Sequence, residues 1–200
     1  MNTPEYHEAA RAMARTASTS KPAPDLLLLH IKLKGITPTI WRRFAVPENI
    51  TLGRLHHVIQ AVMGWDDFHM HEFEIAGERY GTPDPEGWGA EVKSEARKTL
   101  IKALSGKKTF DYIYDFGDDW RHHIKIEKKL PAVACPRVPY CIDGANACPP
   151  EDVGGGPGYE DFLQAMADPE HPEHDAMLEW YGEAFDPAAF DCERVNRLFE

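Results

Sequence analysis

The densest group of side chains capable of chemistry lies in the stretch YDFGDDWRHHIKIE, residues 114–127. Nine consecutive positions hold three aspartates, a tryptophan and two histidines among them, namely Asp115, Asp118, Asp119, Trp120, His122 and His123. Carboxylate oxygens and imidazole nitrogens together bind divalent metals. Aspartates at a chain reversal also accept hydrogen bonds from backbone N–H groups, and a tryptophan just past a turn commonly fills the core. Turn chemistry by itself favours this second interpretation.

The stretch HMHEFE adds His69 and His71, which lie two positions apart and therefore on one face of a strand. Metal sites use this spacing, although strand histidines more often pack or form hydrogen bonds. A metal-dependent hydrolase is one hypothesis that joins the two stretches. Its metal ligands would be His69, His71, Asp115, Asp118, Asp119 and His122, with Glu151 or Asp152 as general base. No cofactor is assigned, and a divalent metal is the one left open.

Three of the four cysteines lie in CPRVPYCIDGANAC, where five and then six residues separate Cys135, Cys141 and Cys148. A zinc ribbon needs paired Cys-x-x-Cys steps, which this stretch lacks. A zinc site of these three thiolates and one histidine stays an alternative. Buried, reduced cysteines that act as small apolar residues are the favoured interpretation.

The stretch PPEDVGGGPGYEDF is a glycine-rich loop that runs into a helix, and exposed N–H groups at a helix start can hold an anion. It lacks the Gly-Lys-Ser/Thr ending of a phosphate-binding loop, so we expect it to dock the C-terminal helices onto the sheet. The chain also contains neither a Gly-x-Ser-x-Gly elbow nor a His-Glu-x-x-His helix. No catalytic residue is therefore assigned, and an enzyme is not favoured.

The charge of the chain restricts its partners. It carries 22 Lys and Arg against 33 Asp and Glu, a net charge of −11. Nucleic-acid binding depends on basic side chains that replace counterions, and anionic membranes attract basic surfaces. A general nucleic-acid binder and a membrane-surface protein are therefore disfavoured, and a protein or peptide partner is expected. Without a bilayer-spanning apolar segment or a signal peptide, the sequence predicts a cytoplasmic protein.

The hydrophobic pattern predicts the elements that position these side chains. Two strands occupy residues 26–46, a helix runs from an N-cap at Thr51 to a stop at Gly64, and a strand follows within 68–77. A Gly/Pro-rich loop at 77–89 precedes a hairpin over 109–128, with Phe110, Tyr112, Tyr114 and Phe116 on one strand face. Residues 131–158 are expected to be irregular. Three helices are predicted at 158–168, 173–185 and 186–199, the last capped by Asp186.

This order predicts an α+β domain over residues 24–200. Its sheet would be mixed or antiparallel, with one helix between strand pairs and a helical C-terminal segment. Residues 1–23 carry few large apolar side chains and are expected to form a disordered tail.

Three long segments together resemble one known family. They are PTIWRRFAVPENITLGRLHHVIQAVMGWDDFHMHEFEI, YDFGDDWRHHIKIE, and the run from CIDGANACPPEDVGGGPGYEDFLQA to WYGEAFDPAAFD. In this order they are similar to the Ri-plasmid "third open reading frame"-like family, also met as the TnpR-labelled passenger protein of an insertion element. The resemblance covers about residues 25–199. It implies an α+β fold, a largely unknown function, and that HMHEF, DFGDDWRHH and PPEDVGGG line one surface.

The leading hypothesis is a non-enzymatic binding or accessory module associated with mobile genetic elements. Its binding-surface candidates are Trp41, Arg42, His69, His71, Asp115, Asp118, Asp119, Trp120 and His122. The metal-dependent hydrolase is the alternative. A role in DNA recombination ranks third, because the TnpR label suggests a resolvase but the chain carries no arginine-clustered nucleophile and is strongly acidic.

Overall fold

A computed structural model describes residues 23–83 and 91–200. The tail predicted over residues 1–23 falls on residues 1–22, outside the described part. Residues 84–89 of the predicted loop at 77–89 also lie outside the described part, and the loop prediction is wrong for Glu78–Gly81, which form a strand paired with Phe73–Ile75.

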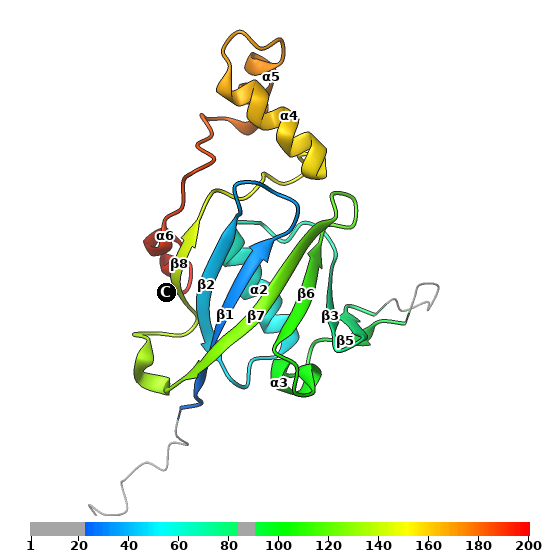
Figure 1. The fold of residues 1–200 in the computed structure, drawn as a ribbon, viewed down its shortest axis with the longest axis vertical. Helices are drawn as coiled ribbons and strands as arrows, with labels where there is room; N and C mark the ends of the chain where they lie inside the picture. Colours follow the sequence, from blue (N-terminus) through cyan, green and yellow to red (C-terminus); the bar gives the residue numbers. More distant parts are fainter. Residues whose placement is uncertain (1–22, 84–90) are drawn as a thin grey trace, which may run out of the picture.

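An eight-stranded mixed sheet is the centre of the fold, as Figure 1 shows. The strands follow one another across it in the order β5-β4-β3-β6-β7-β1-β2-β8, and only β4 and β5 pair in parallel. Their bounds are β1 (Leu26–Leu33), β2 (Trp41–Pro47), β3 (His71–Ile75), β4 (Glu78–Gly81), β5 (Lys93–Ser94), β6 (Thr109–Tyr114), β7 (Trp120–Leu130) and β8 (Tyr140–Ala145). The predicted α+β class is confirmed.

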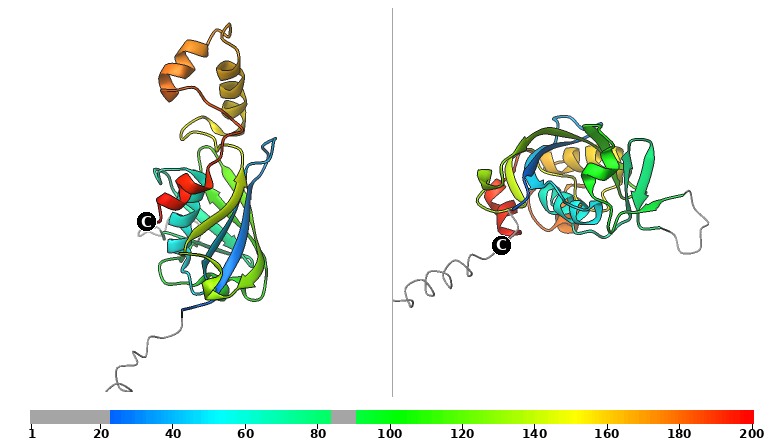
Figure 2. Two further views of the ribbon diagram at one scale, coloured as in Figure 1. Left: turned by 90° about the vertical axis from the view of Figure 1, so that its left-hand side faces the viewer. Right: turned by 90° about the horizontal axis from the view of Figure 1, so that it is seen from below.

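Helix α2 (Leu52–Met63) lies against one face of the twisted sheet (Figures 1 and 2). Both predicted ends are confirmed: the Thr51 side chain accepts from the Arg54 N–H, and Gly64 takes the left-handed conformation at φ 99°. Its apolar stripe, including Leu55 and Ile59, is buried against the strand residues that face it. Fully burying one such side chain contributes about 1.5–3 kcal/mol, so this layer holds the helix in place.

The predicted hairpin of β6 and β7 is confirmed, with Tyr114 opposite Trp120. Between them Asp115 and Asp119 adopt positive φ values of 54° and 55°, which aspartate tolerates better than most residues. The predicted apolar face is correct only as far as the strand extends. Phe116 is 50% exposed because β6 ends at Tyr114 and the turn directs the following side chain outward.

The expectation of irregular structure over residues 131–158 is wrong for β8. The polar and glycine residues of CIDGA give no hydrophobic alternation, so the sequence pattern does not indicate this edge strand. The strand depends on partners distant in sequence. It pairs with β2, and the Asn196 side chain holds it from the other side. The Cys141 N–H donates to Asn196 Oδ1 at 2.7 Å, and Asn196 Nδ2 donates back to the Cys141 carbonyl at 2.8 Å.

The remaining helices are α3 (Leu100–Leu104), α4 (Gly155–Ala167), α5 (His174–Tyr181) and α6 (Cys192–Arg197). In Figure 1, α4 and α5 lie beyond one end of the sheet, and α6 lies beside β8. The predicted cap at Asp186 is wrong, because Asp191 caps the last helix and accepts from the N–H groups of Glu193 and Arg194. The chain stays non-helical up to Asp191 while Phe190 packs under the guanidinium of Arg42. Among the described residues, we find no helix with the length and apolarity required to cross a bilayer.

Candidate functional site

Four polar side chains from three separate segments meet where the β6–β7 turn approaches the start of α4. We call them the tip cluster: His69, Asp115, Glu151 and Asp152. His69 lies between α2 and β3, Asp115 opens the β6–β7 turn, and the other two precede α4. From His69 Nε2, the distances are 3.0 Å to Asp152 Oδ1, 3.7 Å to Asp115 Oδ2 and 3.9 Å to Glu151 Oε2.

The atoms that face one another in the tip cluster have unused bonding capacity. His69 Nε2 and Glu151 Oε2 are buried and have no hydrogen-bond partner among the described residues. Asp152 Oδ1 is within reach of His69 but out of line for a hydrogen bond. Asp115 Oδ1 accepts from the N–H groups of Gly117 and Asp118, so Oδ2 remains to face His69. Buried polar atoms without partners are uncommon in proteins.

Tyr114 holds the tip cluster together from below. Its hydroxyl donates to Glu151 Oε1 at 2.8 Å and accepts from the N–H groups of Phe68 at 3.0 Å and His69 at 3.4 Å. Burial, followed by the neighbouring Glu151, raises the pKa of Tyr114, so the phenol keeps its proton and remains a donor. The Asp115 N–H donates to the Met70 carbonyl at 2.9 Å and ties the turn to the histidine segment.

A second polar group joins side chains of α2 to side chains of the sheet. We call it the histidine stack: His56, Gln60, Asp67, His71, Glu95 and Tyr112. The rings of His56 and His71 are parallel within 5°, with centroids 3.4 Å apart. His71 Nε2 is 2.9 Å from Glu95 Oε2, and His56 Nε2 is 2.7 Å from Asp67 Oδ1.

Each side chain in the histidine stack makes at least one hydrogen bond to another member. Gln60 Nε2 donates to the Tyr112 hydroxyl at 2.9 Å, and the same hydroxyl lies 2.8 Å from His56 Nδ1. A neutral His56 with its proton on Nε2 satisfies both of its contacts. Burial and then the adjacent His71 lower the pKa of His56 to about 4, despite the opposing effect of Asp67. Although His56, His57 and Asp67 are spaced for a metal, this stack is already satisfied.

The structure divides the predicted metal ligands. His69 and Asp115 belong to the tip cluster, together with Glu151 and Asp152, which the hydrolase hypothesis assigned as bases. His71 belongs to the histidine stack. Asp118 Oδ2 accepts from the Gly154 N–H at 3.1 Å and holds the start of α4, and Asp119 pairs with Arg121 at 2.9 Å.

Two predicted residues of the hairpin lie in the core. Trp120 is buried, and His122 is completely buried with Nδ1 3.2 Å from the Tyr112 carbonyl. Burial lowers the pKa of His122 to about 4. Its ring stands edge-on to Trp65, with centroids 5.2 Å apart and an angle of 84°. His122 is thus a neutral packing residue, out of reach of a partner at the surface.

The β2 candidates also differ from one another. Arg42 is 1% exposed, and its guanidinium donates to the carbonyls of Val62, Trp41 and Ala145 at 2.8 Å each. It therefore cross-links β2, α2 and β8 inside the protein. Trp41 is half-buried, with the His30 ring 5.4 Å away.

The three loop cysteines do not form a common set of ligands in the described part of the chain. Cys141 Sγ lies 3.9 Å from Cys192 Sγ, while Cys148 Sγ is 3.9 Å from the Arg42 guanidinium. All four cysteines are free thiols. Burial raises the pKa of Cys141 and of Cys148 to about 12, so both thiols stay protonated.

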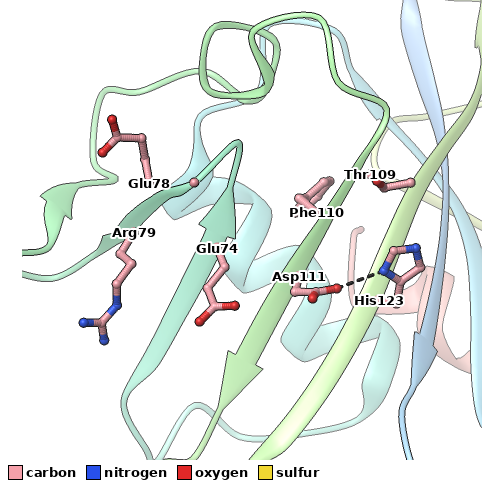
Figure 3. Close-up of a pocket in the computed structure, with 8 residues that line it drawn as sticks. Glu74, Glu78, Arg79, Thr109, Phe110, Asp111 and His123 are labelled. Carbon is pink, nitrogen blue, oxygen red and sulfur yellow. Dashed lines mark hydrogen bonds and ion pairs between the residues drawn. The ribbon is translucent and has the colours of Figure 1, made fainter.

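A surface hollow of about 420 Å³ lies elsewhere, over the sheet face opposite α2, as the close-up in Figure 3 shows. Its lining includes Glu74, Arg79, Asp111 and His123. Asp111 contacts His123 at 2.9 Å and Lys34 at 3.0 Å. Burial raises the pKa of Asp111, but these two partners outweigh it and lower the pKa overall. Because its central charges are paired, this hollow carries less potential chemistry than the tip cluster.

Sequence reasoning missed the role of Tyr114 and the exposure of Phe68, Met70 and Phe116. One signal was present for the tip cluster: HMHEF, DFGDDWRHH and PPEDVGGG each contribute at least one residue to it.

Fold and site together define an acidic α+β protein whose three recognisable sequence motifs converge at one end of the sheet. The chain belongs to the family described as "Plasmid pRiA4b ORF-3-like protein", which matches residues 25–194. The predicted family is thereby confirmed. The relatives reported below are also without an assigned function.

Two relatives illustrate the family. The chain is 43% identical over 179 residues to "Uncharacterized protein y4hQ" of Sinorhizobium fredii (strain NBRC 101917 / NGR234), covering 88% of this chain and 91% of that protein. It is also similar to the crystal structure of the protein of unknown function MM3350 from Methanosarcina mazei Go1. That match has a TM-score of 0.75 and 39% identity, and covers 84% of this chain and 96% of the other.

Proposed function

We propose that this protein is a non-enzymatic binding module that recognises a peptide segment with basic and large apolar side chains. The surface that would bind it consists of Phe68, Met70 and Phe116, which we call the docking surface. An accessory role on a mobile genetic element and a cytoplasmic location, where the four thiols would stay reduced, belong to the same proposal.

The exposure of the docking surface is the observation that carries the proposal. Phe68 is 71% exposed, Met70 64% and Phe116 50%. Single exposed apolar residues are ordinary, but these three stand on two segments that the Asp115–Met70 hydrogen bond joins. Phe68 and Met70 flank His69, and Phe116 follows Asp115, so the docking surface borders the tip cluster.

Charge indicates the chemistry of the occupant. The protein carries a net charge of −11, and the exposed carboxylates of Asp66 and Asp152 and the half-buried one of Asp118 lie on the same three segments as the docking surface and the tip cluster. Complementary charge speeds the encounter and selects the partner, while apolar contacts at the centre of an interface supply most of its affinity. A basic and apolar peptide matches both features, whereas nucleic acid would be repelled.

The test is selection from a displayed random-peptide library on the full-length chain. We expect enriched peptides to carry Lys or Arg next to large apolar residues. Their affinity should fall at least about tenfold for the triple variant Phe68→Ser, Met70→Ser, Phe116→Ser. The matched control is Val133→Ser, in the short 3₁₀ helix η1 (Ala132–Ala134), because Val133 is 90% exposed and belongs to another surface.

Three results would contradict the proposal. They are no enrichment over an unrelated protein, enriched peptides without basic residues, and equal binding of the selected peptides to the triple variant and to Val133→Ser.

A further inference from the structure

We propose that the tip cluster is a binding site for one divalent transition-metal ion of the Mn²⁺ to Zn²⁺ series. Its ligands are His69 Nε2, Asp115 Oδ2, Glu151 Oε2 and Asp152 Oδ1. This inference goes beyond the proposed function, because it concerns an ion rather than the peptide, and different side chains carry it.

The donor set suits such an ion. The donor atoms of His69, Asp115 and Asp152 all lie within 4.8 Å of one another, and Glu151 Oε2 is 3.9 Å from the imidazole nitrogen. One imidazole nitrogen with three carboxylate oxygens fits Fe²⁺ and Zn²⁺, which are borderline ions, and the oxygen-preferring transition-metal ion Mn²⁺ better than Ca²⁺ or Mg²⁺, which take oxygen ligands almost exclusively. Small side-chain rotations would bring the four atoms to one centre.

The unpartnered atoms are the second, independent observation. His69 Nε2 and Glu151 Oε2 are each buried without a hydrogen bond among the described residues, although both face the same small volume. The Asp115 side chain is only 9% exposed and directs Oδ2 into that volume. Buried donors and acceptors without partners are costly, as are like charges held close together. A divalent cation would satisfy all of these groups at once.

A simple ion pair explains the arrangement less well. Asp152 Oδ1 is 3.0 Å from His69 Nε2 but makes no hydrogen bond with it, and Glu151 Oε2 would still have no partner among the described residues. The histidine stack shows what a satisfied pair looks like in this protein, since His56 and Asp67 form a 2.7 Å hydrogen bond.

The surrounding structure positions the four ligands. The Tyr114 hydroxyl donates a hydrogen bond to Glu151 Oε1, and N–H groups of the turn donate to Asp115 Oδ1. One oxygen of each carboxylate is thereby fixed in place, and the other oxygen is available to a metal ion. Ordering of metal ligands by such outer contacts is a general feature of metal sites. An ion here would also cross-link the segment before β3, the β6–β7 turn and the segment before α4. Metal binding is what the hydrolase hypothesis requires, but the inference concerns binding alone.

The experiment titrates chelator-treated, full-length protein with Mn²⁺, followed by the electron paramagnetic resonance signal of the free ion, and with Zn²⁺ by calorimetry. No peptide is present, so the outcome is independent of the proposed function. We expect one saturable site and a rise in Tm with bound metal. Asp115→Asn and Glu151→Gln should each weaken binding at least about tenfold, because each removes a charged ligand. Both variants retain the oxygen that accepts the structural hydrogen bond, so we expect them to fold.

The matched control is Asp67→Asn, which removes a carboxylate from the histidine stack and should leave metal affinity unchanged. Two results would overturn the inference: the absence of saturable binding of either ion, or binding that Asp67→Asn weakens while Asp115→Asn and Glu151→Gln do not. A circular dichroism spectrum matching that of the wild type checks the fold of each variant. Should Asp115→Asn fail that check, Glu151→Gln decides the outcome.

Discussion

The tip cluster and the histidine stack both combine histidine, carboxylate and tyrosine neighbours, and each takes one residue from the segment Trp65–Met70, but their polar atoms are used differently. In the histidine stack, His56 bonds to Tyr112 and Asp67, and His71 bonds to Glu95. In the tip cluster, Nε2 of His69 and Oε2 of Glu151 have no hydrogen-bond partner among residues 23–83 and 91–200. The histidine stack is a structural hydrogen-bond network, whereas the tip cluster has the unpartnered polar atoms expected of a ligand-binding site.

The difference shows that residue type and spacing do not decide the role of a histidine. His69 and His71 lie two positions apart, which suggested one shared face. His71 begins β3 and stacks on a helix residue, whereas His69 precedes the strand in a segment held by the Tyr114 hydroxyl. The two histidines differ in whether their ring nitrogens have hydrogen-bond partners, which only the three-dimensional structure reveals.

Acid is expected to have the largest effect, and it should act through buried histidines. His56 and His122 have pKa values lowered to about 4 in the folded protein, against about 6.5 when unfolded. Between pH 6.5 and pH 4 the unfolded chain binds more protons than the folded protein. The contribution of the two neutral histidines to folding stability is therefore fully present above pH 6.5 and is lost as the pH falls toward 4. Full loss corresponds to about 3 kcal/mol for each of the two histidines.

The measurement is urea unfolding at several pH values between 7 and 4. His56→Ala should show a smaller loss of stability over this range than the wild type. An identical pH dependence of stability in His56→Ala and the wild type would show that His56 does not contribute to acid unfolding.

The second-largest effect is expected from truncating one histidine in each group at neutral pH. The loss of unfolding free energy should differ between the two groups. His56→Ala removes a buried ring that stacks on His71 and bonds to Tyr112, so we expect unfolding free energy to fall by about 3 kcal/mol. His69→Ala removes a ring with an unpartnered nitrogen, and we expect a loss below about 1 kcal/mol. Equal losses in chemical denaturation would contradict the division into a structural and a ligand-binding group.

A Glu→Gln change in each group should give the smallest effects, with opposite signs. In metal-free protein, Glu151→Gln removes one negative charge from a cluster that also holds Asp115 and Asp152, and it should stabilise by about 0.5–1 kcal/mol. Glu95→Gln weakens a charged hydrogen bond to His71 and should destabilise by about 1 kcal/mol. Differential scanning calorimetry after chelation measures both, and a lower Tm for Glu151→Gln would mean that its carboxylate is already stabilised without metal.

The amino-acid sequence by itself determined the elements that depend on neighbouring residues. The alternating leucines of β1, the caps Thr51 and Gly64 around α2, and the hairpin around Asp115–Asp119 all follow from local hydrophobic period and backbone preference. The three motifs of the family were also visible, and with them most of the residues of the tip cluster.

The tertiary structure decided what long-range contacts control. Strand β8 exists because β2 and Asn196 satisfy its backbone, and α6 begins only at Cys192, after Phe190 has packed on Arg42. Arg42 is buried because backbone carbonyls of its neighbours accept its hydrogen bonds, and His122 is buried as a packing residue with Nδ1 at the Tyr112 carbonyl and Nε2 without a partner among the described residues. The roles of His69 and His71 were likewise assigned by partners far away in the chain. A local pattern cannot specify such partners, because each one depends on where the rest of the chain has folded.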